Sequence, residues 1–271
     1  MVRLSIVTGV ILGIGILLIT ASICVIQWNS FKRRRRTIPE ILRNIELLRN
    51  FAVKTLESHP DRITSALAVT NFEYVRHTLM MEGIPGDDQL QINCIIAATN
   101  YVTEDFKLGK ITEANIRTIH AHVMRYEHPE IAGQFRDHDV SIRMKDGSIS
   151  IPPSHTQVVT LMNQFIAWLN EKNPQTFEER LLLAAEAKLR LVVIHPFSDG
   201  NGRVSRALFN GLLRQMQAVP YVSIPCNTKQ EYFSAIRMTR DTNKNETFTK
   251  FILLLIEQSF EKFNKELSSS S

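Results

Sequence analysis

Residues 195–206 read HPFSDGNGRVSR, and several of these side chains could take part in one reaction. His195 carries an imidazole whose usual pKa lies near neutrality, so it can accept a proton from an alcohol. Asp199 supplies a carboxylate that can hold Mg²⁺, with phosphate oxygens and water completing the coordination. Arg203 and Arg206 lie three residues apart, so on a helix they share a side from which guanidinium groups can bind phosphate.

The glycines between these side chains suit an anion. In Gly200-Asn201-Gly202 the backbone N–H groups can turn inward, next to the free N–H groups and positive dipole end of a following helix. Taken singly, a helix-end histidine, a GNG turn and early arginines each have an ordinary structural explanation. Their combination favours attack by a hydroxyl on a nucleotide phosphate. The chain contains neither GxxxxGK[ST] nor HExxH, the common phosphate and zinc motifs.

The elements that must position these residues are helices. Residues 177–194 are apolar almost all round, which predicts a buried helix that ends at His195 because Pro196 follows. Apolar residues at helical spacing predict further helices over 38–58, 62–82, 87–105, 112–125, 155–171, 203–217, 229–240 and 246–266. The expected fold class is all-α.

One segment has a different period. In HDVSIRMKDGSISI, residues 138–151, apolar and polar residues alternate on both sides of Asp146-Gly147. This pattern predicts a β-hairpin. An isolated hairpin is barely stable, so we expect it to lie over the 195–206 loop.

The N-terminal segment is apolar. Residues 4–28 contain no charged side chain, and as a helix they would extend roughly 37 Å, enough to cross a hydrocarbon layer of about 30 Å. We expect a retained transmembrane anchor rather than a cleaved signal peptide, whose apolar region is normally shorter. Gly9 and Gly13 form a GxxxG spacing that can bring two such helices together.

Positive charge gathers directly after this segment, at Lys32, Arg33, Arg34, Arg35 and Arg36. The whole chain has a net charge of +5, but residues 1–36 carry +6 and residues 37–271 carry −1. The basic composition therefore describes the juxtamembrane segment, where contact with lipid headgroups is favoured over a nuclear address or nucleic-acid arm. For the remaining chain we expect no nucleic-acid partner.

The expected organisation is an anchor at 1–31, a basic linker with a helix at 32–60, a helix with an inhibitory motif at 61–86, the main helical domain at 87–266 and a disordered tail at 267–271. The three cysteines, Cys24, Cys94 and Cys226, have no CxxC spacing. They indicate neither a disulfide framework nor a zinc site.

The stretch at 195–206 resembles the Fic-domain family in its HPFx[DE]GNGRxxR form, and every fixed position matches. The resemblance extends over roughly residues 60–266, including GQFRDHDVSI, IPPSHTQV and QFIAWLN. It implies that His195 activates a Ser, Thr or Tyr hydroxyl of a target protein and that Asp199 binds Mg²⁺. It also implies that Gly200, Asn201, Gly202, Arg203 and Arg206 hold the phosphates of ATP, so that AMP is transferred and pyrophosphate leaves.

A second motif supports this resemblance. HTLMMEG at 77–83 fits the family's inhibitory pattern [ST]xxxE[GN], with Thr78, Glu82 and Gly83 in place. The pattern implies that Glu82 pairs with Arg206 and makes ATP bind unproductively. In similar relatives this glutamate also positions a water that removes AMP from the target.

The resemblance also assigns the hairpin and the base pocket. It implies that the hairpin is a flap where Val140 and Ile142 line an extended target segment, and that Tyr232 and Phe233 contact the nucleobase. Arg240 stands where an adenine-contacting asparagine would align. UTP or CDP-choline therefore remains an alternative donor, and a non-catalytic membrane adaptor that binds peptides is an alternative of a different class.

Partners and location follow from similarity to animal endoplasmic-reticulum members, which modify the Hsp70-class chaperone BiP. Those relatives carry tetratricopeptide repeats where this chain has only residues 32–60, so the target does not transfer directly, and the sequence leaves a homodimer open. The relatives imply a single-pass protein with a lumenal domain, and the sequon Asn245-Glu246-Thr247 is compatible with the lumen. The basic residues after the span instead favour a cytosolic domain.

Overall fold

The structure, a computed structural model, describes residues 33, 35–143, 147, 149–216, 219–242 and 244–269. The chain divides into two compact units, residues 1–41 and 42–271. In the first unit, Thr37 and Glu40 start a helix, since the backbone N–H and hydroxyl of Thr37 donate to Glu40 Oε2 at 2.6 and 2.9 Å. That helix is α2, which begins at Ile38 and whose residues 42–58 belong to the second unit.

The second unit is mainly helical, which confirms the predicted fold class. Its elements are α2 (Ile38–Ser58), α3 (Arg62–Met81), α4 (Gln89–Asp105), α5 (Glu113–Met124), β1 (Ile142–Arg143), β2 (Ile149–Ser150), α6 (His155–Asn170), α7 (Phe177–Ile194), α8 (Asn201–Arg214), a 3₁₀ turn (Cys226–Thr228), α9 (Lys229–Thr242) and α10 (Glu246–Ser269). Each predicted helix is present, and most ends agree within two residues.

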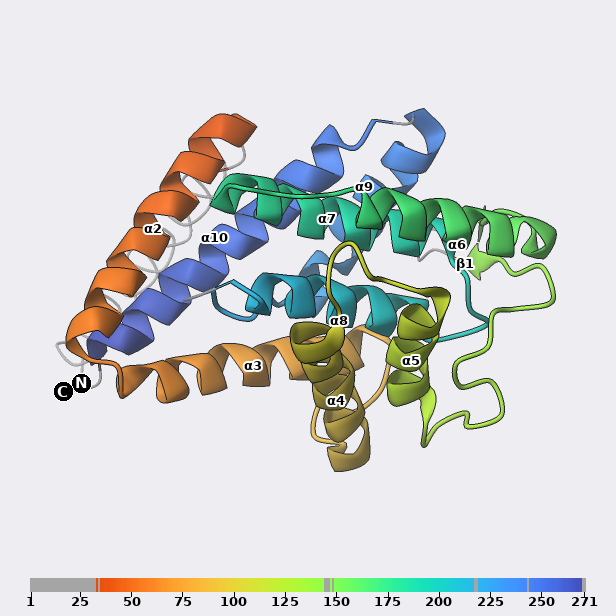
Figure 1. Cartoon of the computed structure of the whole chain (residues 1–271), viewed down its shortest axis with the longest axis horizontal. Helices are drawn as coiled ribbons and strands as arrows, with labels where there is room; N and C mark the ends of the chain where they lie inside the picture. Colours follow the sequence, from red (N-terminus) through yellow and green to blue (C-terminus); the bar gives the residue numbers. More distant parts are fainter. Residues whose placement is uncertain are drawn as a thin grey trace, which may run out of the picture. The chain divides into compact units, whose positions relative to one another are not determined.

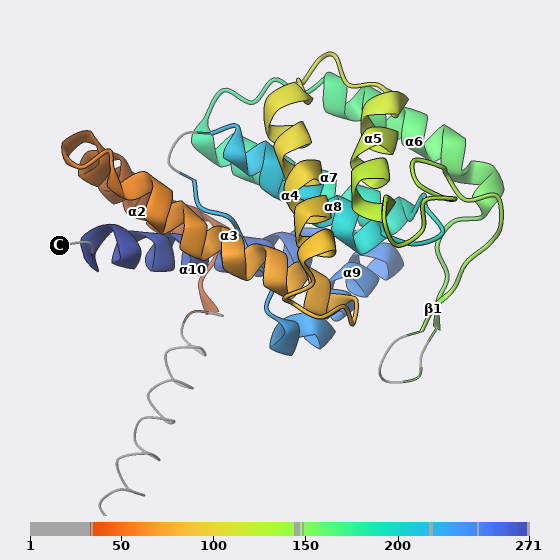
Figure 2. The same cartoon turned by 90° about the horizontal axis from the view of Figure 1, so that it is seen from below.

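Helix α8 lies at the centre of the second unit. It packs against α7 on one side and against α4 and α5 on the other, while α10 packs against α3, α9 and α7 (Figure 1). In the view from below, α4 and α5 run side by side (Figure 2). Most of α8 is buried, including Arg203 and Arg206. A central helix with buried arginines near its start is an unusual arrangement for a core, because charged groups are rarely buried without partners.

The turn from α7 to α8 positions the predicted motif. Helix α7 begins with a capping box, in which the Thr176 side chain accepts from the Glu179 N–H and the Glu179 carboxylate accepts from the Thr176 N–H. It ends at His195, where Pro196 follows. Helix α8 begins two residues earlier than predicted, at Asn201, because Gly200 takes a left-handed conformation and serves as N-cap. Asn201 and Gly202 therefore belong to its first turn.

The predicted hairpin is present in the described part of residues 138–151. Ile142 pairs with Ser150 and Arg143 with Ile149 in antiparallel register. Gly147 has φ +81°, as a tight turn requires. β1 follows a long loop after α5 and lies at the edge of the helices (Figure 2).

The structure describes only part of the two chain ends. The tail was predicted to begin at residue 267, but α10 continues to Ser269, because Leu267 is fully buried against Ala52, Ala66 and Phe263. Within the described residues, no helix is long and apolar enough to cross a membrane. The predicted span at residues 4–28 lies outside that part of the chain, as does Cys24. Cys94 and Cys226 are free thiols.

Candidate active site

A cavity of about 330 Å³ lies where the end of α7, the start of α8, one face of α9 and the hairpin meet. Most of the residues predicted from the sequence to form a site contribute to its lining: Glu82, Ile142, His195, Asp199, Asn201, Gly202, Arg206, Tyr232 and Phe233. The fold thus brings together residues from four regions that are far apart in the sequence.

His195 ends α7 in the left-handed region, with φ +54° and ψ +58°. Such a backbone is uncommon for a residue other than glycine and needs support from its surroundings. Here the His195 N–H donates to the Leu191 carbonyl at 3.0 Å, and the His195 carbonyl accepts from Arg136 Nε at 2.8 Å. These contacts fix the backbone from which the imidazole reaches the cavity.

Burial lowers the pKa of His195 to about 4. The backbone of Val192 opposes this effect, while the positive charges of Arg240 and Arg136 add to it. The imidazole is therefore neutral at pH 7. In that state it has a nitrogen lone pair available to accept a proton from a hydroxyl.

The loop before α8 is closed by the side chain of Asn201. Its Oδ1 accepts from the Phe197 N–H at 2.9 Å, and its Nδ2 donates to the Phe197 carbonyl at 2.8 Å. Gly200 has φ +74°, and a Cβ at this position would lie 2.7 Å from Met124 Sδ. The Asn201 side chain thus shapes the loop, and only its backbone N–H remains for an anion at the start of α8.

Glu82 reaches into the same place from the end of α3. Its carboxylate forms an ion pair with Arg206 Nη2, which also donates to the Thr78 carbonyl at 3.2 Å. A Cβ added to Gly202 would lie 2.5 Å from Glu82 Oε1. The carboxylate therefore lies directly against the glycine of the predicted phosphate cradle, where a phosphate group would compete with it.

The Glu82 carboxylate is negatively charged at pH 7. Burial raises its pKa, but the charges of Arg206, Arg203 and Lys229 outweigh burial and bring the pKa below its usual value. Gly83 supports this position, because its φ of +83° ends α3. Lys229 Nζ also donates to the Met81 carbonyl, joining α9 to the end of α3.

Arg203 does not line the cavity but lies behind it, 1% exposed, between two carboxylates. Its Nη1 pairs with Glu127, and its Nη2 lies 3.3 Å from Asp199 Oδ2. Glu127, His128 and Asp199 each offer a ligand atom, and these atoms lie within 4.8 Å of one another. The Asp199 side chain is 53% exposed and lines the cavity, so its carboxylate fits the oxygen ligand that Mg²⁺ requires.

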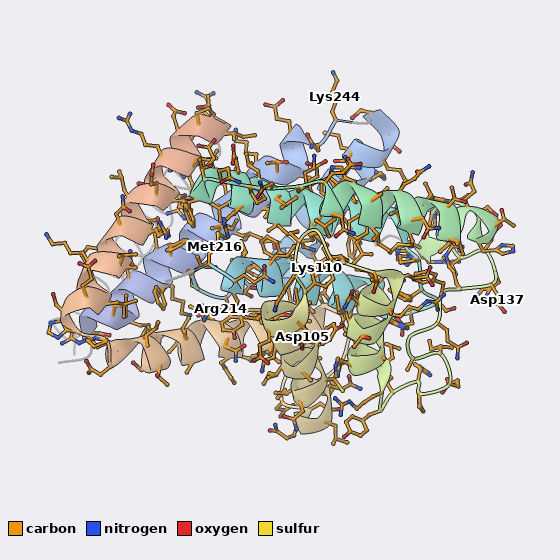
Figure 3. The ribbon with its side chains drawn as sticks, viewed as in Figure 1. Asp105, Lys110, Asp137, Arg214, Met216 and Lys244 are labelled. Atoms are coloured by element: carbon orange, nitrogen blue, oxygen red, sulfur yellow. The ribbon has the colours of Figure 1, made fainter. Side chains whose placement is uncertain are left out.

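The hairpin forms one wall. Ile142 lines the cavity and Val140, half-buried, precedes β1. Arg240 Nη1 donates to Ser150 Oγ, which joins α9 to β2. Below the hairpin, the buried guanidinium of Arg136 donates to the His138 carbonyl at 3.0 Å and also to the Pro153 carbonyl. The neighbouring Asp137 side chain points out from the loop and is 96% exposed (Figure 3).

Two aromatic side chains of α9 form the opposite wall. Tyr232 is 1% exposed and Phe233 is half-buried, and their ring centroids are 5.4 Å apart. Ile236 lies one helical turn further along and also lines the cavity. These side chains offer a flat ring an apolar surface, as their prediction as a base pocket requires.

A segment that contains the central residues of the cavity matches a known family. Residues 110–213 match the model of the Fic/DOC family. This range contains the 195–206 motif, the hairpin and helices α5 to α7. Over these residues the chain resembles a Fic domain.

Three similar proteins are named protein adenylyltransferases. The Fic protein of Aedes aegypti is 31% identical over 202 residues, 74% of this chain and 39% of the relative. The Nematostella vectensis protein is 27% identical, over 73% of this chain and 50% of the relative. The Caenorhabditis elegans fic-1 protein is 26% identical, over 79% and 45%. The chain thus spans half or less of the length of these relatives.

Solved structures agree on the fold. A Fic domain-containing signalling protein from Bacteroides thetaiotaomicron aligns with a TM-score of 0.72 and 18% identity, over 84% of this chain and 98% of that one. Fic-1 of C. elegans, residues 134–508, aligns with a TM-score of 0.68 and 23% identity, over 86% and 73%. At these identities the likeness concerns the fold alone.

Sequence reasoning missed a buried histidine that supports the Fic motif. His120 of α5 stacks on Phe197 with centroids 3.8 Å apart. Its Nδ1 accepts from the Gly133 N–H at 2.9 Å, so its proton is on Nε2, which lies 3.2 Å from the Asp199 carbonyl. Burial lowers the pKa of His120 to about 4. Its spacing in the sequence marked it only as one position of a helix, and Glu127 gave no signal either.

Proposed function

We propose that the chain is a protein adenylyltransferase, which transfers AMP from ATP to a Ser, Thr or Tyr hydroxyl of a target protein. The observation that carries the proposal is the joint position of neutral His195, the Gly202 cradle and the Asp199 carboxylate in one cavity. The names of the relatives support the same activity. Because the chain spans only part of those relatives, the activity of the whole protein is a proposal.

In the proposed reaction, His195 accepts the proton of the incoming hydroxyl. The hydroxyl oxygen forms a bond to the α-phosphorus, and the bond between the α-phosphorus and the bridging oxygen breaks, so that pyrophosphate leaves. Backbone N–H groups at the start of α8 and the Arg206 guanidinium stabilise the negative charge of the phosphates. When bound at Asp199, Mg²⁺ supplies charge neutralisation and orientation of the phosphate oxygens.

Glu82 restrains this reaction in our proposal. Its carboxylate pairs with Arg206 and lies against Gly202, so it occupies the place of the terminal phosphate. A triphosphate that binds while Glu82 is in this position lacks the contact with Arg206. Its α-phosphate is then misaligned for attack by the target hydroxyl. The same carboxylate, anionic at pH 7, can accept a proton from water, which is how the protein would also remove AMP from its target.

One observation favours a nucleotide other than ATP as the donor of the transferred group. The guanidinium of Arg240 lines the cavity beside Ser150, and guanidinium groups only donate hydrogen bonds. Bases with carbonyl oxygens, such as the uracil of UTP, present acceptors to it. Comparing ATP, UTP and CDP-choline as donors tests this alternative.

The target and the membrane belong to the same proposal. An extended segment of a target protein can add to the exposed edge of the hairpin, and an Hsp70-class chaperone is the candidate that the family resemblance suggests. We further propose that residues 4–28 anchor the protein and that the Fic domain faces the lumen. A shift in electrophoretic mobility on glycosidase treatment tests this orientation. We expect the wild-type protein to show the shift and Asn245→Gln to lack it. A wild-type protein without the shift would favour a cytosolic domain.

Transfer of α-phosphate-labelled AMP tests the activity. We expect Glu82→Gly to raise transfer at least tenfold relative to the wild type, since it frees a buried arginine for phosphate. Adding His195→Ala should abolish that signal. Glu171→Gly is a matched control, because Glu171 is the C-cap of α6 and does not line this cavity. If both Glu82→Gly and the double variant behave like the wild type, the proposal is wrong.

A further inference from the structure

A lysine lies buried beneath the cavity, where its amine donates hydrogen bonds to two hydroxyl groups. Lys188 is on α7, two helical turns before His195, and its exposed fraction is 0%. Its Nζ donates to Tyr232 Oη at 2.6 Å and to Ser205 Oγ at 3.4 Å. Within the described residues, no carboxylate forms an ion pair with it.

This arrangement does not favour stability by itself. Burial lowers the pKa of Lys188 well below its usual value, the charge of Arg206 lowers it further, and that of Glu82 raises it. A buried amine that has only hydroxyl partners is costly to desolvate, and replacing it with an apolar residue of similar size is often neutral or stabilising. The stability of the fold therefore does not account for a lysine at this position.

The two partners of Lys188 belong to the other two helices of the cavity. Tyr232 is on α9 and lines the cavity directly. Ser205 is on α8, and its hydroxyl donates to the Gly202 carbonyl at 2.9 Å, in the turn that cradles the anion. Through one side chain, α7 is thus joined to the aromatic wall and to the glycine turn.

We propose that Lys188 is a positioning residue of the nucleotide cavity, which holds Tyr232 and Ser205 at the spacing that a bound nucleotide needs. The proposal rests on the proposed function and adds a residue that touches neither the target hydroxyl nor the phosphates. Without Lys188, α9 loses this polar connection to α7, so the aromatic wall and the glycine turn are no longer held through one side chain.

Lys188→Met tests this role, because methionine fills similar space without hydrogen bonds. In a Glu82→Gly background, we expect the KM for ATP to rise about tenfold, the loss of roughly one such contact, with a smaller change in kcat. The melting temperature should stay the same or rise, which a merely structural role would not produce. Tyr232→Phe should raise the KM for ATP by a similar factor. The variant that combines Lys188→Met with Tyr232→Phe should have a KM no higher than that of the single variant with the higher KM, because both substitutions remove the same contact. Lys110→Met is the control, since Lys110 is exposed and outside the cavity (Figure 3).

Hydrogen exchange without nucleotide separates this inference from the proposed function. We expect residues 229–242 to exchange faster in Lys188→Met and Tyr232→Phe, while residues 113–124 stay unchanged. If Glu82→Gly shows no transfer, the proposed function fails, but the exchange rates still test Lys188. Unchanged exchange in both variants, or an unchanged KM in a background that transfers AMP, overturns the role of Lys188. If Lys188→Met does not fold, Tyr232→Phe alone decides.

Discussion

The ion pair between Glu82 and Arg206 gains its importance from burial. An exposed pair contributes at most about 1 kcal/mol, but the Arg206 side chain is only 3% exposed, and its guanidinium also donates to the Thr78 carbonyl. Removing Glu82 therefore leaves a buried cation without its counter-ion, a state that costs several kcal/mol. A triphosphate would relieve that cost, which is the physical basis of our proposal that Glu82 restrains productive nucleotide binding.

The pKa of His195 makes a prediction about pH. Because burial lowers this pKa to about 4, the neutral, proton-accepting form persists well below pH 6.5. Transfer by Glu82→Gly should stay nearly level from pH 8 to pH 5 and fall as the pH approaches 4. Arg240→Met, added to Glu82→Gly, removes a positive charge that lowers the pKa of His195. AMP transfer by this double variant should therefore begin to fall at a higher pH than transfer by Glu82→Gly alone. Initial rates across this range check both; a midpoint near 6.5 in Glu82→Gly would contradict the buried, neutral imidazole.

Helix ends account for much of what the sequence could predict. Pro196 and Gly83 are local signals for the ends of α7 and α3, and the Thr176 capping box is a local signal for the start of α7. The early start of α8 could not be predicted in this way. It depends on the left-handed N-cap at Gly200 together with the pairing of the Asn201 amide with the Phe197 backbone, and this pairing becomes visible only in three dimensions.

Buried polar contacts between helices explain the remaining misses. His120, Glu127 and Lys188 each lie on predicted helices or their flanks, and their spacing fits an ordinary helical pattern. Their roles come from partners 17 to 79 residues away, such as Ser205 for Lys188 and Asp199 for His120. Periodicity identifies which face of a helix is buried, but it does not identify the polar atoms that meet there.

The cap of α7 can be tested by its contribution to stability. Thr176→Ala removes the side-chain acceptor of the Glu179 N–H, and we expect it to lower the free energy of unfolding by about 1 kcal/mol. Since α7 carries His195 at its other end, this measures the stability of the element that presents the imidazole. Urea unfolding is the measurement. Thr64→Ala, at an exposed position within α3, should change stability by less than about 0.5 kcal/mol, and an equal effect of both would contradict the cap's role.

The excess positive charge of the molecule and the residues of its cavity lie in different parts of the sequence. Residues 1–36 carry +6, whereas residues 37–271 carry −1 and include every residue that lines the cavity. Attraction of a nucleotide therefore depends on local groups, the N–H groups of α8 and the buried arginines, rather than on overall charge. This division fits our proposal that the basic segment contacts lipid while the cavity binds a nucleotide.

Calorimetric titration of the protein with Mg²⁺-ATP tests the central claim most directly. Glu82→Gly should bind the nucleotide saturably and at least tenfold more tightly than the wild type, because the carboxylate no longer competes at Gly202 and Arg206. Adding Arg206→Ala should remove most of that gain. If Glu82→Gly binds none of the triphosphates ATP, UTP and GTP in the presence of Mg²⁺, the glycine turn and its arginines are not a phosphate site.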